Sequence, residues 1–361
     1  MKSCPSGRKG ISMAKIRIGF VGTGFMGQCA HLQNYAALED CEVVALAELR
    51  PHLARAVADR YGVPGVYKTH EEMLANEELD GIVASQPFSR HGVLLPDLFR
   101  ARIPVFTEKP LSCSIEAGEK ILEALRRTSA RHYVGYHKRS DLATMFVKRE
   151  IERLKSSGKL GALRYIRILM PAGDWIAAGD ASYINTDEVV PDGPTDPLPS
   201  DMDKETQKMY SGFVNYYIHQ VNLMRHLLGE EYHVTYADPA GILMAVQSES
   251  GIPGAIEMSP YRTTLDWQEQ ALIAFEKGFI RLELPAPLAS NRPGKVTLFR
   301  DPGKQASPET IIPQLPWIHA MKQQAIHFVK ALQGEAVPLC EADEAMKDLI
   351  LAREYIRMLK T

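Results

Sequence analysis

The stretch Ile16-Arg17-Ile18-Gly19-Phe20-Val21-Gly22-Thr23-Gly24-Phe25-Met26-Gly27 decides the fold of this chain. A run of β-forming residues leads directly into glycines with the G-x-G-x-x-G spacing, and an apolar-periodic segment follows. In this order of strand, turn and helix, Gly22 permits the turn, Gly24 lets a pyrophosphate approach the backbone, and Gly27 lets the helix pack on the strand. The predicted phosphate site at the helix N-terminus therefore consists of Gly22, Thr23, Gly24, Phe25, Met26 and Gly27.

A second signal lies about 20 residues beyond the glycines, as the dinucleotide fingerprint requires. The β-like run 42–46 ends near Glu48, whose carboxylate is expected to bind the adenosine ribose hydroxyls and to repel the 2′-phosphate of NADP. Arg50 lies close enough along the chain to pair with such a phosphate. NAD is therefore the predicted cofactor, and NADP stays open. The alternative is a glycine-rich turn without a ligand.

Residues 13–136 alternate strand-like and helix-like runs, which predicts an α/β Rossmann domain with a doubly wound parallel sheet. Ligands of such sheets bind at the carboxyl ends of the strands. The strand-like runs 81–85 and 104–107 both end in residues that we assign to the cofactor cleft. These residues are Gln86, Pro87, His91, Glu108 and Lys109.

Residues 137–361 have a different pattern, which predicts an α+β domain for substrate binding and oligomerisation. Hairpin-linked β runs between 232 and 299 predict a large open antiparallel sheet, and a helix over 212–228 precedes them. Two further helices, at 318–332 and 342–359, are expected to pack back on the first domain.

The long polar segment 171–210 is expected to be a functional loop or flap, with a disordered insertion as the alternative. Asp174 and Trp175 open it, and a carboxylate beside an aromatic face suits a sugar, although Trp175 is equally consistent with simple packing. Lys138 and Arg139 begin the second domain and are predicted to bind substrate. A structural ion pair is an equal alternative for Arg139.

Two groups suit proton and charge chemistry. Lys109 follows a strand at its carboxyl end, where it would reach over the nicotinamide and stabilise a developing alkoxide; most lysines are merely surface residues. Asn215, His219 and Asn222 have the spacing i, i+4, i+7 and form one polar stripe on the predicted helix. His219 is the natural general base because the unperturbed pKa of histidine is about 6.5. The alternative is a core histidine.

From about Lys15 to its end, the chain resembles the Gfo/Idh/MocA family of oxidoreductases (glucose–fructose oxidoreductase, inositol dehydrogenase and rhizopine catabolism). The resemblance implies that Lys109 is the active-site lysine and His219 the catalytic histidine. Asn215 and Asn222 stand where the family commonly has aspartates, so the dipoles of two amides replace the negative charges of two carboxylates. The motifs that support the resemblance are Gly22 to Gly27, Glu108-Lys109-Pro110, Gly135 to Arg139, Gly158 to Gly161, and Asn215 to Gly229, which corresponds to D-x-x-x-H-x-x-D and a closing glycine.

The resemblance implies NAD or NADP, oxidation of a secondary alcohol on a sugar, glycoside or cyclitol or the reverse reaction, and homodimers or homotetramers formed through the second sheet. Two alternatives stay open. The first is a redox-assisted glycosidase or lyase that reduces its cofactor only transiently. The second is a non-catalytic cofactor-sensing regulator, which the presence of both Lys109 and His219 disfavours.

The composition argues against other partners. The net charge is −2, which gives no electrostatic reason to bind nucleic acid or a membrane surface. Five cysteines without a C-x-x-C pair predict free thiols in a reducing cytoplasm, with neither a disulfide framework nor a metal site. Residues 1–12 are polar and basic, which predicts a leader or tag and not a secretory signal.

Overall fold

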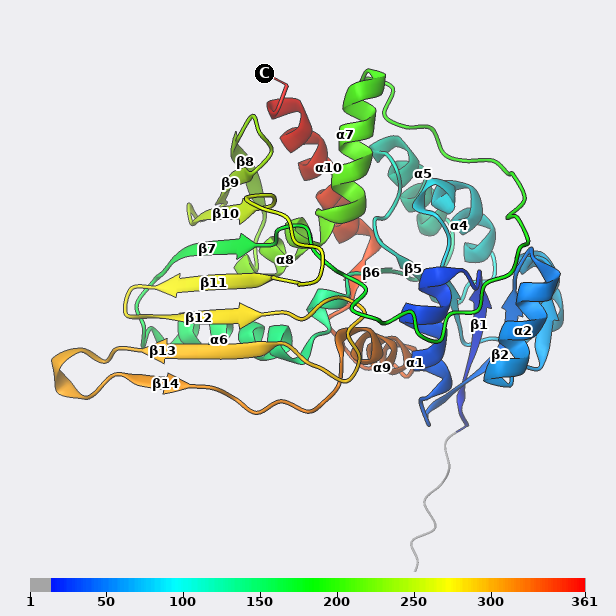
Figure 1. Cartoon of the computed structure of the whole chain (residues 1–361), viewed down its shortest axis with the longest axis horizontal. Helices are drawn as coiled ribbons and strands as arrows, with labels where there is room; N and C mark the ends of the chain where they lie inside the picture. Colours follow the sequence, from blue (N-terminus) through cyan, green and yellow to red (C-terminus); the bar gives the residue numbers. More distant parts are fainter. Residues whose placement is uncertain (1–13, 361) are drawn as a thin grey trace, which may run out of the picture.

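Two sheets organise the protein, as a computed structural model that describes residues 14–360 shows (Figure 1). The predicted leader, residues 1–12, lies outside the described residues. One sheet belongs to the N-terminal part of the chain and the other to the C-terminal part. Among residues 14–360, no helix is both long and apolar enough to cross a membrane.

The first sheet has seven strands in the order β15-β6-β5-β4-β1-β2-β3. Its neighbours pair in parallel except at the edge, where β15 runs antiparallel to β6. The predicted Rossmann sheet is thus confirmed, and the edge strand from the far end of the chain is an addition. The strands are β1 Ile16–Val21, β2 Cys41–Ala47, β3 Gly65–Tyr67, β4 Gly81–Ala84, β5 Val105–Glu108, β6 His132–Gly135 and β15 Cys340–Glu341.

Local signals begin and end the helices between these strands. Thr69 and Ser114 accept backbone N–H groups at the starts of α3 and α5, as N-cap residues do. α2 ends at Gly62, which has a left-handed backbone. The helix after the glycine loop opens with a π-helical turn, η1. The elements are η1 Gly27–Leu32, α1 Gln33–Ala36, α2 Pro51–Tyr61, α3 His70–Asn76, η2 Phe88–Arg90, α4 His91–Phe99 and α5 Ile115–Arg126.

The second sheet has eight strands in the order β14-β13-β12-β11-β7-β10-β9-β8. It is mostly antiparallel, as predicted, but its central strands β7 and β10 pair in parallel. A parallel pair needs a crossover connection, and the chain between these two strands supplies one. The strands are β7 Leu163–Leu169, β8 Tyr232–Ala237, β9 Leu243–Ser248, β10 Pro253–Glu257, β11 Gln270–Phe275, β12 Gly278–Glu283, β13 Lys295–Arg300 and β14 Glu309–Ile311.

Helices cover one face of this sheet. α6 packs on β12 and β13, and α8 packs on β7. Alternate residues of β11 are buried, because one side of each strand meets this helical layer. The predicted homodimer or homotetramer would use the other face, and the oligomeric state stays a prediction. The remaining elements are η3 His137–Arg139, α6 Leu142–Ser157, α7 Lys204–Tyr216, α8 Ile218–Leu228, η4 Gly303–Gln305, α9 Ala320–Leu332 and α10 Ala342–Met358.

The helix predicted over 212–228 is two helices in the structure. α7 begins at Lys204, where Asp203 caps it, and ends at Tyr216. α8 begins at Ile218 after a break at Tyr217, whose ψ of −3° departs from helical geometry. The prediction of one helix was wrong because the apolar and polar periods continue through the break. As a result, Asn215 and His219 lie on different helices.

The last two helices contact the N-terminal part of the chain. α9 packs against η1 and α1, and α10 packs against α5. Phe328 of α9 belongs to the buried cluster of the first domain and meets the ring of Phe106 at a centroid distance of 5.6 Å. The division of the chain at residues 136 and 137 stays a prediction.

The segment 170–203, between β7 and α7, runs across the N-terminal domain (green in Figure 1). It is fastened at several points. The backbone of Ile184 exchanges two hydrogen bonds with the side chain of Gln28. Glu188 accepts backbone N–H groups from the first turn of α2, and Asp196 accepts the backbone N–H of Gly92 in α4. We call it the crossing segment.

Candidate functional site

A cavity of about 430 Å³ lies between residues of the two domains, at the carboxyl ends of β1, β4 and β5. The N-terminal domain contributes Gly24, Phe25, Met26, Gln86, Pro87, Glu108 and Lys109 to its wall. The C-terminal part contributes His137, Lys138, Trp175, Asn215, His219 and Trp267. Eleven of the twenty residues that the sequence predicted for catalysis, cofactor and substrate line this cavity.

The three glycines have the steric roles that the motif predicts. Gly22 has φ +90°, and a Cβ there would lie 2.5 Å from the carbonyl oxygen of Ser85. A Cβ on Gly27 would lie 2.7 Å from the oxygen of Gly22, so the helix approaches the strand closely. A Cβ on Gly24 would meet only Arg50, at 3.8 Å. The loop thus leaves an open face at Gly24, which fits a pyrophosphate.

Glu48 lies at the edge of this loop. Its Oε2 accepts from the backbone N–H of Thr23 at 2.9 Å, and its Oε1 accepts from Nε of Arg50 at 2.8 Å. Burial pushes the pKa of Glu48 upward, but the bonds from Arg50 and Thr23 outweigh burial and leave the pKa below its usual value. Glu48 is therefore ionised beside the glycine loop, and Arg50 is paired with it.

Glu108 ends β5 and Lys109 follows it, and the two side chains have different partners. Oε1 of Glu108 lies 2.7 Å from Nε2 of His31. Burial raises the pKa of Glu108, but His31 and the charge of Lys109 outweigh it and leave the pKa below its ordinary value. Burial lowers the pKa of Lys109, and the positive charge of Lys138 lowers it further, while Glu108 opposes both.

The break between α7 and α8 brings a backbone acceptor to Lys109. Asn215 lies in the last turn of α7, where carbonyl groups lack a donor within the helix. The carbonyl oxygen of Asn215 accepts from Nζ of Lys109 at 2.7 Å. The contact between these two residues therefore depends on the backbone and not on the amide side chain.

His219 has a second histidine beside it. The rings of His137 and His219 meet edge to face at a centroid distance of 4.7 Å. Burial lowers the pKa of both imidazoles well below 6.5, and the charges of Lys109 and Lys138 lower it further. His219 is therefore neutral at pH 7 and free to accept a proton. The sequence places His137 just after β6, at a carboxyl end of the sheet where ligands bind, but it assigned this residue no role.

Lys138 belongs to a buried ion pair whose partners the sequence did not reveal. Its Nζ lies 2.5 Å from Oε2 of Glu269, and Oε1 of Glu269 accepts from Nε2 of Gln220 at 2.9 Å. Nζ of Lys138 also lies 5.6 Å from the ring centroid of Trp267. No sequence signal joins these residues, because more than a hundred positions separate Lys138 from Glu269.

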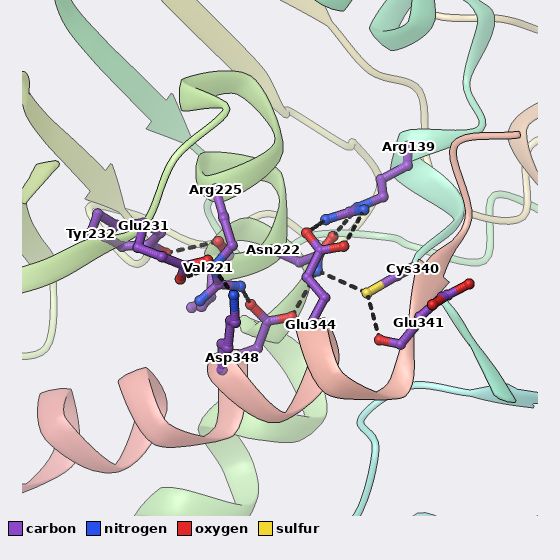
Figure 2. A network of polar contacts seen from close by, with 11 residues as sticks. Arg139, Val221, Asn222, Arg225, Glu231, Tyr232, Cys340, Glu341, Glu344 and Asp348 are labelled. Carbon is purple, nitrogen blue, oxygen red and sulfur yellow. Dashed lines mark hydrogen bonds and ion pairs between the residues drawn. The ribbon is translucent and has the colours of Figure 1, made fainter. Parts of the chain in front are cut away.

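Arg139 and Asn222 lie elsewhere than predicted. Figure 2 shows them in a buried polar network with Arg225, Glu344 and Asp348, away from the cavity wall. Arg139 donates to Oδ1 of Asn222 at 2.7 Å and is paired with Glu344. Asn222 donates to Oδ2 of Asp348 at 2.7 Å. These partners on η3 and α10 hold Asn222 and Arg139 in the network, so both side chains are committed to structure.

Two other predicted residues also face away from the cavity wall. His91 is buried, and its Nδ1 lies 3.0 Å from the carbonyl oxygen of Leu111. Oδ1 of Asp174 accepts the backbone N–H groups of Ile176 and Ala177 and closes a turn of the crossing segment. Trp175, in contrast, lines the cavity and packs on Phe25 of the glycine loop, with ring centroids 5.9 Å apart.

Comparison with known proteins agrees with this architecture. Residues 16–136 match the model of the GFO_IDH_MocA oxidoreductase family, described as an NAD-binding Rossmann fold. The inositol 2-dehydrogenase of Rhizobium meliloti is 23% identical over 95% of this chain and 96% of its own length. The myo-inositol 2-dehydrogenase of Thermotoga maritima is also 23% identical, but the match spans 67% of this chain and only 63% of that protein.

Solved structures share the fold over almost the whole chain. An NAD-binding oxidoreductase from Klebsiella pneumoniae superimposes with a TM-score of 0.72, at 16% identity, over 96% of this chain and 97% of that one. At this identity the likeness concerns the fold alone. The family match at residues 16–136 and the nearly full-length inositol dehydrogenase relative support an oxidoreductase of the Gfo/Idh/MocA family.

Proposed function

We propose that this protein is an NAD(P)-dependent oxidoreductase that oxidises a secondary alcohol of a sugar, glycoside or cyclitol, or reduces the corresponding ketone. The main support is that Lys109 and His219 reach one cavity from different domains, beside the glycine loop. The relative from Rhizobium meliloti, an inositol 2-dehydrogenase that aligns over nearly the whole chain, supports a polyhydroxylated ring as the substrate.

The roles of the residues follow from their protonation states. When bound, the nicotinamide cofactor supplies the hydride chemistry. His219, neutral at pH 7, accepts the hydroxyl proton of the substrate. Lys109 remains protonated below its lowered pKa and stabilises the negative charge that develops on the same oxygen. Lys138 is held in the wall by Glu269 and donates to a neighbouring hydroxyl.

NAD is the cofactor that we propose, with NADP as the less favoured possibility. Gly22 to Gly27 would hold the pyrophosphate, and Glu48 would accept hydrogen bonds from the adenosine ribose. Gln86, Pro87 and the start of the 108–109 turn line the end of the cavity that the nicotinamide would occupy. Arg50 is already paired with Glu48, which supports NAD over a cofactor with an additional phosphate.

A spectrophotometric screen tests the proposal. Purified protein is mixed with NAD or NADP and with inositols, aldoses, uronic acids and glycosides, and absorbance at 340 nm (from reduced nicotinamide) is followed. We expect at least one ring alcohol to yield reduced cofactor, and Lys109→Ala to abolish the signal. A parent protein that binds NAD tightly but oxidises no compound of these classes would contradict the proposal.

A second cavity supports one alternative function, that of a redox-assisted glycosidase or lyase. A space of about 310 Å³, lined by Trp175, Tyr216, Arg262 and neighbouring residues, adjoins the main cavity across the first two of these side chains. Such a space gives room for a substituent on the sugar, as a redox-assisted glycosidase or lyase would require. This enzyme would cleave a glycoside without net accumulation of NADH, so parallel assays of sugar release and absorbance at 340 nm separate the two functions.

A further inference from the structure

The side chains around the proposed catalytic pair carry more positive than negative charge. Two lysines, Lys109 and Lys138, face the cavity with the neutral pair His137 and His219. Glu108 is the one carboxylate among the described residues that line this cavity, and it is bonded to His31. α8 contains no acidic residue, and α7 presents Asn215. The side of the cavity formed by α7 and α8 therefore lacks a negative charge of its own.

A carboxylate from the residue that precedes β11 contacts α8 behind the cavity wall formed by α7 and α8. Glu269, just before β11, has a side chain with no exposed area and is paired with Nζ of Lys138 at 2.5 Å. Burying both charges is favourable only where the pair is close and its other lone pairs are bonded. Glu269 meets both conditions, because Gln220 donates to its second oxygen.

The same carboxylate joins the two elements that carry the histidines. Lys138 is the neighbour of His137 in η3, and Gln220 is the neighbour of His219 in α8. Glu269 therefore links η3 to α8 through residues adjacent to the two histidines, whose rings meet. The other groups near Glu269 are Trp267, beside Lys138, and the ionisable side chains of Asp141 and Tyr216.

We propose that Glu269 is the positioning residue of this site and that, by pairing with Lys138, it offsets positive charge beside the catalytic pair, which the uncharged amide of Asn215 cannot do. The inference rests on the proposed roles of Lys109 and His219. Removing the charge of Glu269 would leave Lys138 uncompensated and make the potential at Lys109 and His219 more positive. A unit charge about 10 Å away in a medium of effective dielectric constant near 20 changes a pKa by roughly one unit.

The experiment compares pH profiles of kcat/KM for the parent, Glu269→Gln, Glu269→Asp and Glu269→Gln/Asn215→Asp. For Glu269→Gln we expect the alkaline limb, where Lys109 loses its proton, to move about one pH unit lower. Glu269→Asp retains the charge and should keep the parental limb, and the double variant should recover it. Glu249→Gln, which changes an exposed glutamate following β9 of the same sheet, is the matched control and should change nothing.

A purely structural role would lower activity or stability without moving the limb. A limb of Glu269→Gln that coincides with the parental one, or a double variant that fails to restore it, would overturn the proposal. If Glu269→Gln does not fold, a displaced limb in Glu269→Asp overturns it instead.

If the parent oxidises nothing, the proposed function fails separately. The Lys109 ammonium can then be titrated by NMR of ¹³C-lysine protein, assigned with Lys109→Arg, and an unmoved titration in Glu269→Gln would again overturn the proposal.

Discussion

Replacing Asn215 with aspartate should move the pH profile of the enzyme upward. Nζ of Lys109 lies 2.7 Å from the backbone oxygen of Asn215, which would put a carboxylate on this side chain about 6 Å from the ammonium. Two opposite unit charges at about 6 Å interact by roughly 2.8 kcal/mol at an effective dielectric constant near 20. That corresponds to about two pKa units, and solvent around the exposed Asn215 side chain reduces it to about one.

The sign follows from the protonation state that each group needs. A negative neighbour favours the protonated form, so the pKa of Lys109 rises and the alkaline limb of kcat/KM for alcohol oxidation moves about one unit higher. The pKa of His219 rises as well, so the acid limb also moves upward. Profiles of the parent, Asn215→Asp and the distant exposed control Asn76→Asp measure the shift. Unmoved limbs with retained activity would show that the Asn215 side chain does not act on either group.

Four further outcomes are expected. Lys109→Ala should lower kcat by about 10²-fold or more while NAD still binds by fluorescence titration; loss of binding by a folded variant would make Lys109 a cofactor-positioning residue. With Glu48 at the ribose, kcat/KM should be higher with NAD than with NADP, and a tenfold preference for NADP would refute this. Trp175→Ala should raise KM for the sugar with the Kd of NAD nearly unchanged, whereas identical kinetics would leave Trp175 a packing residue. Asp348→Ala should lower the free energy of unfolding by about 3–5 kcal/mol, because Arg225 keeps only Glu231 as a carboxylate partner and the Asn222 amide loses its carboxylate acceptor; urea denaturation measures this, and a loss under 1 kcal/mol would contradict it.

The local sequence pattern was sufficient to predict the positions of those site residues that lie at the ends of strands. The glycine loop, Glu48 and Lys109 each follow a β run directly, so their positions could be predicted from the order of residues alone. The break at Tyr217 could not, because the polar stripe from Asn215 to Asn222 is continuous in sequence.

Distant partners could not be predicted at all. Glu269, just before β11, meets Lys138 of η3 across more than a hundred positions of the chain, and no short motif encodes such a contact. Arg139 is a related case. Its position at the domain start left a substrate contact and a structural ion pair equally open, and α10 supplies Glu344, which pairs with the guanidinium. Partners from the end of the chain are not encoded near the residues they meet.

The edge strand β15 determines when the first sheet can complete its folding during synthesis of the chain. While the first 136 residues leave the ribosome, β6 still has an open edge, and an unpaired edge is a template for pairing with other chains. Cys340 and Glu341 close that edge, and Phe328 fills the core beside it only when α9 has emerged. The N-terminal sheet is therefore encoded first but completed almost last, and the edge of β6 stays open to pairing with other chains until nearly the whole polypeptide is available.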